Sequence, residues 1–205
     1  AIVKHPTYQE LVFKLAWEFT TVLPGSFERD RKAVRGRKFP IIAPLPNNAR
    51  NTLPIENSQD SGPYLYSVYT QDGEIKYIGK ATDKTVLMRW IRPDKSRNKY
   101  YWTHGTTSAK AVSTVEKIAD EISNSNGPVR LYFANYSKLF TLVQQHCQDC
   151  SADPSEIETM PQDEFIKELE HYMTYTLQPL WNIQNKNRPP TSSIVQCGDY
   201  WNGNY

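Results

Sequence analysis

A pair of tyrosines stands on either side of a tight-turn signal near the middle of the chain. Asp72-Gly73 separates two strand-like segments, 64–70 and 75–79, and this dipeptide is a strong indication of a β-hairpin. A two-residue loop puts Tyr66 opposite Gly79 and makes Tyr77 its diagonal neighbour on the same sheet face. Adjacent phenols orient water and transfer protons, and Gly79 leaves bare backbone where a substrate group can approach. The alternative is that both tyrosines are half-buried packing residues, since tyrosine is common in strands.

A carboxylate interrupts the apolar stripe of a helix expected over 162–177. Ile166, Glu170, Met173 and Leu177 share one face at helical spacing. An unpaired buried carboxylate is costly, so the pattern predicts a metal ion or a cationic partner for Glu170. A glutamate oxygen suits Mg²⁺, which prefers hard oxygen ligands and phosphates. The alternative is a glutamate at the edge of the stripe or in a structural salt bridge.

Positive charge is concentrated in two stretches, although the formal net charge of the chain is only +2. Residues 76–110 hold nine Lys and Arg against Asp83 and Asp94, whereas residues 111–205 carry a net charge of −6. Basic clusters attract a phosphate backbone because each neutralised phosphate releases counterions. A merely solvated surface is the alternative. The candidate DNA contacts are basic residues of both stretches and two aromatics beside the second: Arg29, Arg31, Lys32, Arg35, Arg37, Lys38, Arg92, Lys95, Arg97, Lys99, Tyr101 and Trp102.

Length and composition bound the class of protein. The 205 residues suffice for one domain of catalytic size without a stabilising disulfide or metal. The apolar runs are far shorter than the roughly 18 residues of a membrane span, and no signal segment is recognised, so we expect no membrane partner and a cytoplasmic location. Three cysteines fit a reducing compartment. Cys147 and Cys150, with His146 and Cys197, form an incomplete zinc pattern, for which ordinary helix-end cysteines are the alternative.

The elements that position these residues are predicted from periodicity and turn signals. The capping box Thr7-x-x-Glu10 opens a predicted N-terminal helix that reaches Val22, and Pro24-Gly25 ends it. Residues 26–61 predict a basic, then proline-rich, arm. Helices are also predicted over 84–91, 109–122, 138–146 and 162–177, a charged loop over 92–99, and a third strand over 129–136. The predicted fold class is α+β: a small antiparallel sheet of about three strands flanked by helices, with an N-terminal helix and basic arm.

Five features in sequence order make the chain resemble the GIY-YIG nuclease superfamily. Tyr64-Leu65-Tyr66 and Tyr77-Ile78-Gly79, with ten residues between them, resemble the two halves of the hairpin motif. Arg89 follows where the family has a phosphate-binding arginine, and Glu170 lies where it has a metal-binding glutamate. Asn182 follows Glu170 by twelve residues, as in the family's late pattern. The resemblance covers residues 62–182. It departs from the family in reading Tyr-Leu-Tyr for the first half, and in a longer segment before Arg89.

For the tyrosines, the resemblance implies a role in activating water. Tyr66 is the expected general base or water-orienting phenol, and Tyr77 supports it. A free phenol has a pKa of about 10, so it needs a nearby cation to act near neutrality. Lys80 resembles a lysine that several members carry at this place and is the candidate cation. Which tyrosine takes the proton is left open by the sequence.

For the remaining residues, the resemblance implies contacts with phosphate and metal. Arg89 would clamp the scissile phosphate and stabilise developing negative charge, with a surface arginine as the alternative. Glu170 would hold one Mg²⁺ per site. Asn182 is expected to orient a phosphate or tie down nearby backbone, or else to cap a helix. Some members carry a histidine one turn after the arginine, where this chain has Pro93, and His104 is the candidate substitute.

The resemblance implies a Mg²⁺-dependent endonuclease acting on double-stranded DNA, most like the stand-alone type II restriction enzymes. Residues 62–187 would form the nuclease core, between an N-terminal helix and arm (1–61) and a C-terminal tail (188–205). Cutting both strands of a palindrome with one site per chain requires a homodimer or higher homo-oligomer. The alternatives are a nonspecific nuclease toxin or phage nuclease, and a DNA-binding module of the same fold without turnover.

Overall fold

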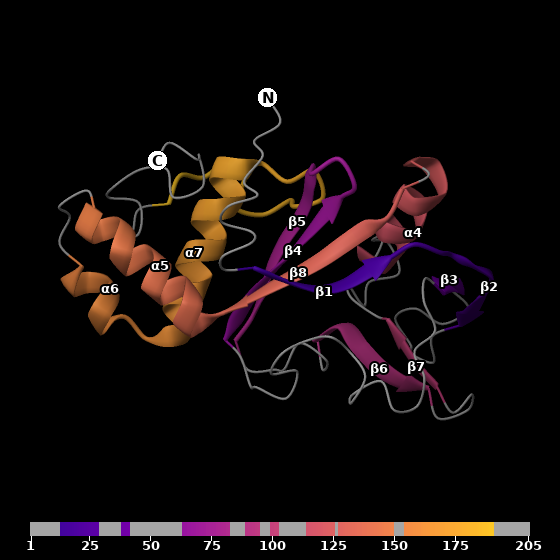
Figure 1. Cartoon of the computed structure of the whole chain (residues 1–205), viewed down its shortest axis with the longest axis horizontal. Coiled ribbons are helices and arrows are strands. Elements are labelled where there is room, and N and C mark those ends of the chain that lie inside the picture. The colour runs from indigo at the N-terminus through magenta and orange to yellow at the C-terminus, as the bar shows by residue number, and fades with distance from the viewer. Residues whose placement is uncertain are drawn as a thin grey trace.

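The computed structural model of the chain describes residues 13–28, 38–41, 63–82, 89–94, 99–102, 114–125, 127–149 and 154–190 (Figure 1). The strands, in chain order, are β1 (Lys14–Phe19), β2 (Leu23–Glu28), β3 (Lys38–Ile41), β4 (Tyr64–Thr70), β5 (Ile75–Ala81), β6 (Ile91–Asp94), β7 (Lys99–Trp102) and β8 (Val129–Asn135). The helices are α4 (Thr114–Ser125), α5 (Tyr136–Asp149), α6 (Ser155–Thr159) and α7 (Gln162–Leu177).

A four-stranded antiparallel sheet forms the centre of the described part of the fold. Its strand order is β1-β8-β4-β5, so the β4–β5 hairpin lies beside β8, and β1 and β5 are the two edge strands (Figure 1). Two further strand pairs, β2–β3 and β6–β7, lie outside this sheet. The predicted α+β class with an antiparallel sheet and helices is confirmed, and β1 supplies a fourth strand.

The predicted N-terminal helix is wrong over residues 14–19, which form β1. Three apolar side chains are buried there at intervals of three residues: Phe13, Ala16 and Phe19. Leu15 and Trp17 face neighbouring residues of β8, so Ala16 is the extra residue of a β-bulge. A bulge interrupts the two-residue alternation of a strand, and the remaining spacing imitates a helix. Residues 1–12, with the predicted capping box, lie outside the described residues.

The β4–β5 hairpin has the predicted register around the tyrosines, but its loop differs from the predicted one. Tyr66 faces Gly79 and Val68 faces Tyr77, as expected. The loop is one residue longer, because the Thr70 N–H donates to the Glu74 carbonyl at 2.9 Å. Gly73 takes a left-handed φ of 84° there, which glycine adopts without strain.

A bulge in β5 cancels the effect of the odd-length loop. Val68 and Tyr69 are consecutive, yet they face Tyr77 and Ile75, so Lys76 is an extra residue in β5. The longer loop and the bulge shift the register by one residue each, in opposite senses. Tyr66 and Tyr77 therefore share a face even though the two-residue loop is absent.

Each face of the sheet carries its own hydrophobic core. On one face, residues of α4, Trp90 and Trp102 pack against even-numbered residues of β4. On the other, α5, α6 and α7 pack against Leu65 and Ile78. Figure 1 shows α5, α6 and α7 gathered at one end of the molecule, with α4 and the β6–β7 pair at the other.

The other elements follow the sequence predictions unevenly. Strand β8 and helices α5 and α7 are confirmed, and α6 was not expected. The predicted arm contains β3 and the second half of β2, and the predicted charged loop overlaps most of β6 and the first residue of β7. Of the helix predicted over 84–91, Arg89 and Trp90 are helical, Ile91 begins β6, and residues 84–88 lie outside the described residues. Among the described residues, no helix has the length and apolar content that crossing a membrane requires.

Candidate active site at the edge strand β5

Tyr66 and Tyr77 form a stacked pair on one face of the hairpin. Their ring centroids are 6.1 Å apart with planes inclined by 23°. Tyr66 is only 1% exposed, and Tyr77 is half-buried. The rings of Tyr64 and Trp90 close around Tyr66 at 6.1 Å and 5.3 Å between centroids. The two tyrosines are therefore in contact with each other, as the register predicts, and Tyr66 is packed among aromatic rings, as the alternative interpretation expects.

Gly79 is required by the position of the Tyr66 ring. A Cβ atom built at Gly79 would lie 2.4 Å from the Cε2, Cζ and hydroxyl oxygen atoms of Tyr66. Non-bonded carbon atoms pack at about 3.5–4.0 Å, so no larger residue fits beneath this ring. The bare backbone expected at this position is filled by Tyr66 itself.

The two phenols are connected in one hydrogen-bonded chain with Arg89. The Arg89 guanidinium donates to the Tyr66 hydroxyl, and the hydroxyls of Tyr66 and Tyr77 are hydrogen-bonded to each other. Arg89 is exposed, whereas the adjacent Trp90 is buried and its ring meets that of Tyr66 edge-on. Trp90 thus anchors the short helical turn that brings Arg89 to the tyrosines. This role of Trp90 was not predicted from the sequence, although a tryptophan beside a candidate phosphate-binding arginine was the available signal.

The electrostatics of the pair keep both phenols protonated. Burial raises the pKa of Tyr66 well above its usual value, and the neighbouring Tyr77 raises it further, against the opposing charge of Arg89. Burial also raises the pKa of Tyr77, as does the negative charge of Glu170. Neither residue is a standing phenolate near neutral pH. Both act there as hydrogen-bonding phenols.

Glu170 reaches the edge strand from α7. Glu170 is 9% exposed, and its neighbours on the same helical face, Ile166 and Met173, are core residues, as the stripe predicts. Its Oε2 atom forms an ion pair with the Lys80 ammonium of β5. Lys80 is thus the cationic partner that the sequence predicts for Glu170. The pair joins the tyrosines through Glu170, whose charge acts on Tyr77.

Asn182 ties the chain after α7 to the hairpin. Its amide oxygen accepts the Ile78 N–H at 2.9 Å, and its amide nitrogen donates to the Ile78 carbonyl at 2.8 Å. The Trp181 N–H donates to the Lys76 carbonyl at 2.8 Å. Of the roles expected for Asn182, the backbone tie is the one observed. The left-handed residue that ends α7 is Gln178.

These bonds also explain how β5 is protected. As an edge strand, β5 would expose unpaired backbone groups, and such edges recruit other strands. Trp181 and Asn182 cover part of that edge with the three hydrogen bonds just described. Lys76 and Ile78, which precede Gly79, are thereby held in place from outside the sheet.

Several candidate residues lie elsewhere or outside the described residues. Trp102, which was expected to contact DNA, is 4% exposed and packs on Phe19, with ring centroids 4.8 Å apart. Lys38 lies in β3, Arg92 in β6, and Lys99 and Tyr101 in β7. The candidates outside the described residues are His104, Arg29, Arg31, Lys32, Arg35, Arg37, Lys95 and Arg97.

The oxygen donors at β5 fit a magnesium ion better than they fit zinc. The described residues contain no group of three or more His, Cys, Asp or Glu side chains able to hold a metal. Mg²⁺ needs fewer protein ligands, because it keeps several waters and binds through one or two carboxylates together with substrate phosphates. The single carboxylate of Glu170 is compatible with that requirement. Cys147 is buried in the core, and Cys150 and Cys197 lie outside the described residues.

Comparisons with known protein families, curated proteins and solved structures return no match for this chain.

Proposed function

We propose that the chain is a Mg²⁺-dependent endonuclease of the GIY-YIG type that hydrolyses phosphodiester bonds of double-stranded DNA. One observation carries the proposal. Tyr66, Tyr77, Arg89 and the Lys80–Glu170 ion pair, selected from sequence because they resemble the family's motifs, are all linked around one edge strand. Residues of a merely accidental resemblance have no reason to meet there, since they are spread over about 100 positions of the chain.

The proposed roles follow from what phosphodiester hydrolysis requires. The reaction needs an oriented water, neutralisation of charge on the scissile phosphate, and help for the leaving oxygen. Arg89 is exposed and already directed at the tyrosine pair, so its remaining guanidinium donors are assigned to the phosphate. Tyr77 and Tyr66 are assigned to orienting the attacking water.

The tyrosines are proposed to act first as orienting groups. Because both pKa values are raised, neither phenol removes a proton from water unaided. In the chain from Arg89 through Tyr66 to Tyr77, each hydroxyl has a fixed acceptor or donor, which holds it in one orientation. Arg89 also opposes the rise in the pKa of Tyr66, so it favours release of that phenol's proton.

Glu170 is the residue proposed to hold Mg²⁺. When bound there, the ion would neutralise charge on the phosphate and on the leaving oxygen. Lys80 forms an ion pair with the same carboxylate. We assign Lys80 to neutralising the charge of that buried group before metal and DNA bind. The same ion pair favours one alternative function, a DNA-binding module without turnover, since a carboxylate fully satisfied by lysine needs no metal.

Sequence-specific restriction is the proposed biological activity, with a homodimer or higher homo-oligomer delivering two sites to a palindrome. The test is incubation of the purified chain with unmethylated phage and plasmid DNA, in Mg²⁺ and in EDTA. Discrete Mg²⁺-dependent fragments support a restriction enzyme. A smear supports a nonspecific nuclease, and DNA that is bound but intact supports the binding module.

A further inference from the structure

The chain that follows α7 forms a loop that is closed at both ends by hydrogen bonds. The Gln178 side-chain amide donates to the Lys186 carbonyl at 2.7 Å. The His171 ring nitrogen Nε2 donates to the Arg188 carbonyl at 2.6 Å. These bonds hold residues 178–188, which we term the β5 loop, against the end of α7. Figure 1 shows this segment in gold beside β5.

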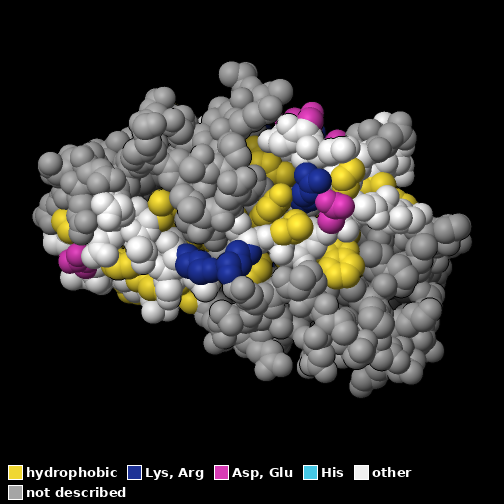
Figure 2. Space-filling view, in the orientation of Figure 1, with side chains coloured by type: hydrophobic (Ala, Val, Ile, Leu, Met, Phe, Trp, Pro, Cys, Tyr) yellow, Lys and Arg dark blue, Asp and Glu magenta, His cyan; other side chains and the backbone are white. Residues whose placement is uncertain are grey.

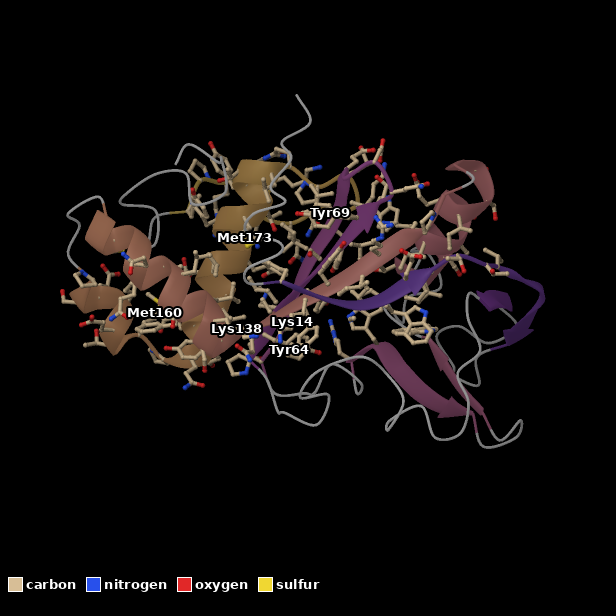
Figure 3. The ribbon with its side chains drawn as sticks, in the orientation of Figure 1. Lys14, Tyr64, Tyr69, Lys138, Met160 and Met173 are labelled. Carbon is tan, nitrogen blue, oxygen red and sulfur yellow. The ribbon has the colours of Figure 1, made fainter. Side chains whose placement is uncertain are left out.

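The β5 loop borders the candidate active site. Asn182 bonds to both backbone groups of Ile78, and Trp181 packs against the core cluster on the tyrosine side of the sheet. Met173, labelled in Figure 3, fixes α7 to the hairpin, because it belongs to the same core cluster as Ile78. Ile78 and Lys80 both lie in β5, about 7 Å apart along the strand. A substrate at the site therefore lies next to the loop.

Two apolar side chains of the β5 loop face solvent. Leu180 is 62% exposed and Ile183 is 86% exposed, which makes them the two most exposed large apolar side chains among the described residues. They flank Trp181 and Asn182, whose three hydrogen bonds to β5 fix the backbone between them. The loop thus presents both side chains from a rigid backbone, so little ordering remains to be done when a partner binds.

The charge of this surface is positive. Residues 171–190 contain no Asp or Glu, but they include Lys186 and Arg188. On the adjacent hairpin, Glu74 is neutralised by Lys76 at 3.0 Å. On the face drawn in Figure 2, by comparison, a Lys or Arg side chain lies directly beside an Asp or Glu side chain, with apolar side chains around both. An apolar surface flanked by cations matches DNA, whereas two copies of it would repel each other across a two-fold axis.

We propose that the β5 loop contacts the minor groove of the DNA next to the scissile phosphate. Leu180 and Ile183 lie against sugars and base edges there, because apolar side chains on a rigid support suit that groove. Lys186 and Arg188 lie on the flanking phosphates. This inference rests on the proposed nuclease function and adds the surface that holds the duplex. The contact reads the shape and deformability of the groove rather than individual bases.

The test is binding of a fluorescein-labelled duplex in EDTA, so that the DNA stays intact, measured by anisotropy over a range of salt concentrations. Leu180→Ala and Ile183→Ala are compared with wild type and with Leu15→Ala, at a 42% exposed leucine of the opposite edge strand β1. Each methylene lost from an apolar contact is worth about fourfold in affinity. Each loop variant should therefore bind about 10-fold more weakly, and Leu15→Ala should match wild type.

The cations of the loop should give a different signature. Lys186→Gln and Arg188→Gln should each make the slope of log K against log salt shallower by about 1. Leu180→Ala and Ile183→Ala should weaken binding with the slope unchanged, because they release no counterions. The urea unfolding midpoints of these variants should equal that of wild type, as for most surface substitutions.

Light scattering of the DNA-free proteins tests the competing occupant. If Leu180→Ala and Ile183→Ala lower the molar mass, the surface is an interface between copies and the inference is overturned. If wild type binds and cuts DNA while both alanine variants keep its affinity, the inference is overturned and the proposed function stands. Loop-dependent binding without cleavage in Mg²⁺ supports the DNA contact and contradicts the proposed catalysis. Wild type that neither binds nor cuts DNA contradicts both.

Discussion

Replacing Gly79 by alanine tests whether the Tyr66 ring lies where the structure has it. The added Cβ would be 2.4 Å from three atoms of that ring, about 1 Å inside normal contact. The ring has little room to retreat, because it is 1% exposed and packed by Trp90 and Tyr77. Overpacking of this kind costs about 1–3 kcal/mol, and the stiffer unfolded chain returns about 0.4–1 kcal/mol. We expect Gly79→Ala to lower the free energy of unfolding by about 1–2 kcal/mol.

Gly79→Ala is also expected to cleave DNA more slowly, and the loss in rate, converted to free energy, should exceed the loss in free energy of unfolding. A displacement of about 1 Å in a catalytic group costs on the order of 100-fold in rate. Both quantities are measured on one preparation, by urea unfolding followed through aromatic fluorescence and by plasmid cleavage in Mg²⁺. Cleavage is compared at a temperature where both proteins are fully folded, so that the rate reports the position of the ring.

Gly127→Ala is the matched control. Its Cβ would also come within 2.4 Å of another atom, but that atom is the Oε1 of Gln71, the end of an exposed and flexible side chain. The side chain can swing away, so we expect a change within about 0.5 kcal/mol and normal cleavage. If Gly79→Ala behaves like Gly127→Ala in both assays, the Tyr66 ring does not lie over Gly79 and the described site geometry is wrong.

Two further predictions concern the tie to the hairpin and the buried phenols. Asn182→Ala removes both hydrogen bonds to Ile78 and should lower the free energy of unfolding, measured in urea, by about 1–3 kcal/mol. The control Asn187→Ala, at an exposed position, should leave it unchanged. Equal effects of the two substitutions would contradict the role of Asn182 in holding Ile78. Burial, and then Tyr132, raises the pKa of Tyr69, so its contribution to stability is complete below about pH 10 and is lost as the pH rises further. Tyr69→Phe should therefore lose less stability than wild type between pH 9 and pH 11, measured by urea unfolding at each pH, and parallel curves would refute this.

The sequence predicted the tyrosine pair correctly, although one step of the reasoning was wrong. The local signal at Asp72-Gly73 indicated a two-residue loop, but the structure has a longer loop and an extra residue at Lys76. Each of these differences alone would have moved Tyr77 to the other face. The carbonyl of the extra residue, Lys76, accepts a hydrogen bond from Trp181, more than 100 positions away, and no local pattern encodes such a contact.

The N-terminal strand and the burial of Trp102 were not predicted, for a related reason. A bulge at Ala16 gives β1 a helix-like spacing, so periodicity indicated the wrong element. Trp102 follows a basic run, which suggested an exposed aromatic, but it packs against Phe19 and Trp17 of β1. The buried position of Glu170 was predictable because Ile166 and Met173 lie on the same face of its helix, whereas its ion pair with Lys80 of β5 joins residues that are distant in sequence.

The central claim is that Glu170 serves Mg²⁺-dependent DNA cleavage. The most direct measurement is the rate at which supercoiled plasmid is converted to nicked and linear forms, in Mg²⁺ and in EDTA. Wild type, Glu170→Gln and the neighbouring control Glu168→Gln are compared after their folded fractions have been matched by urea unfolding. The account predicts cleavage by wild type and Glu168→Gln in Mg²⁺ only, and a loss of at least about 100-fold for Glu170→Gln. Equal cleavage by Glu170→Gln and Glu168→Gln, or cleavage by wild type that persists in EDTA, would contradict it.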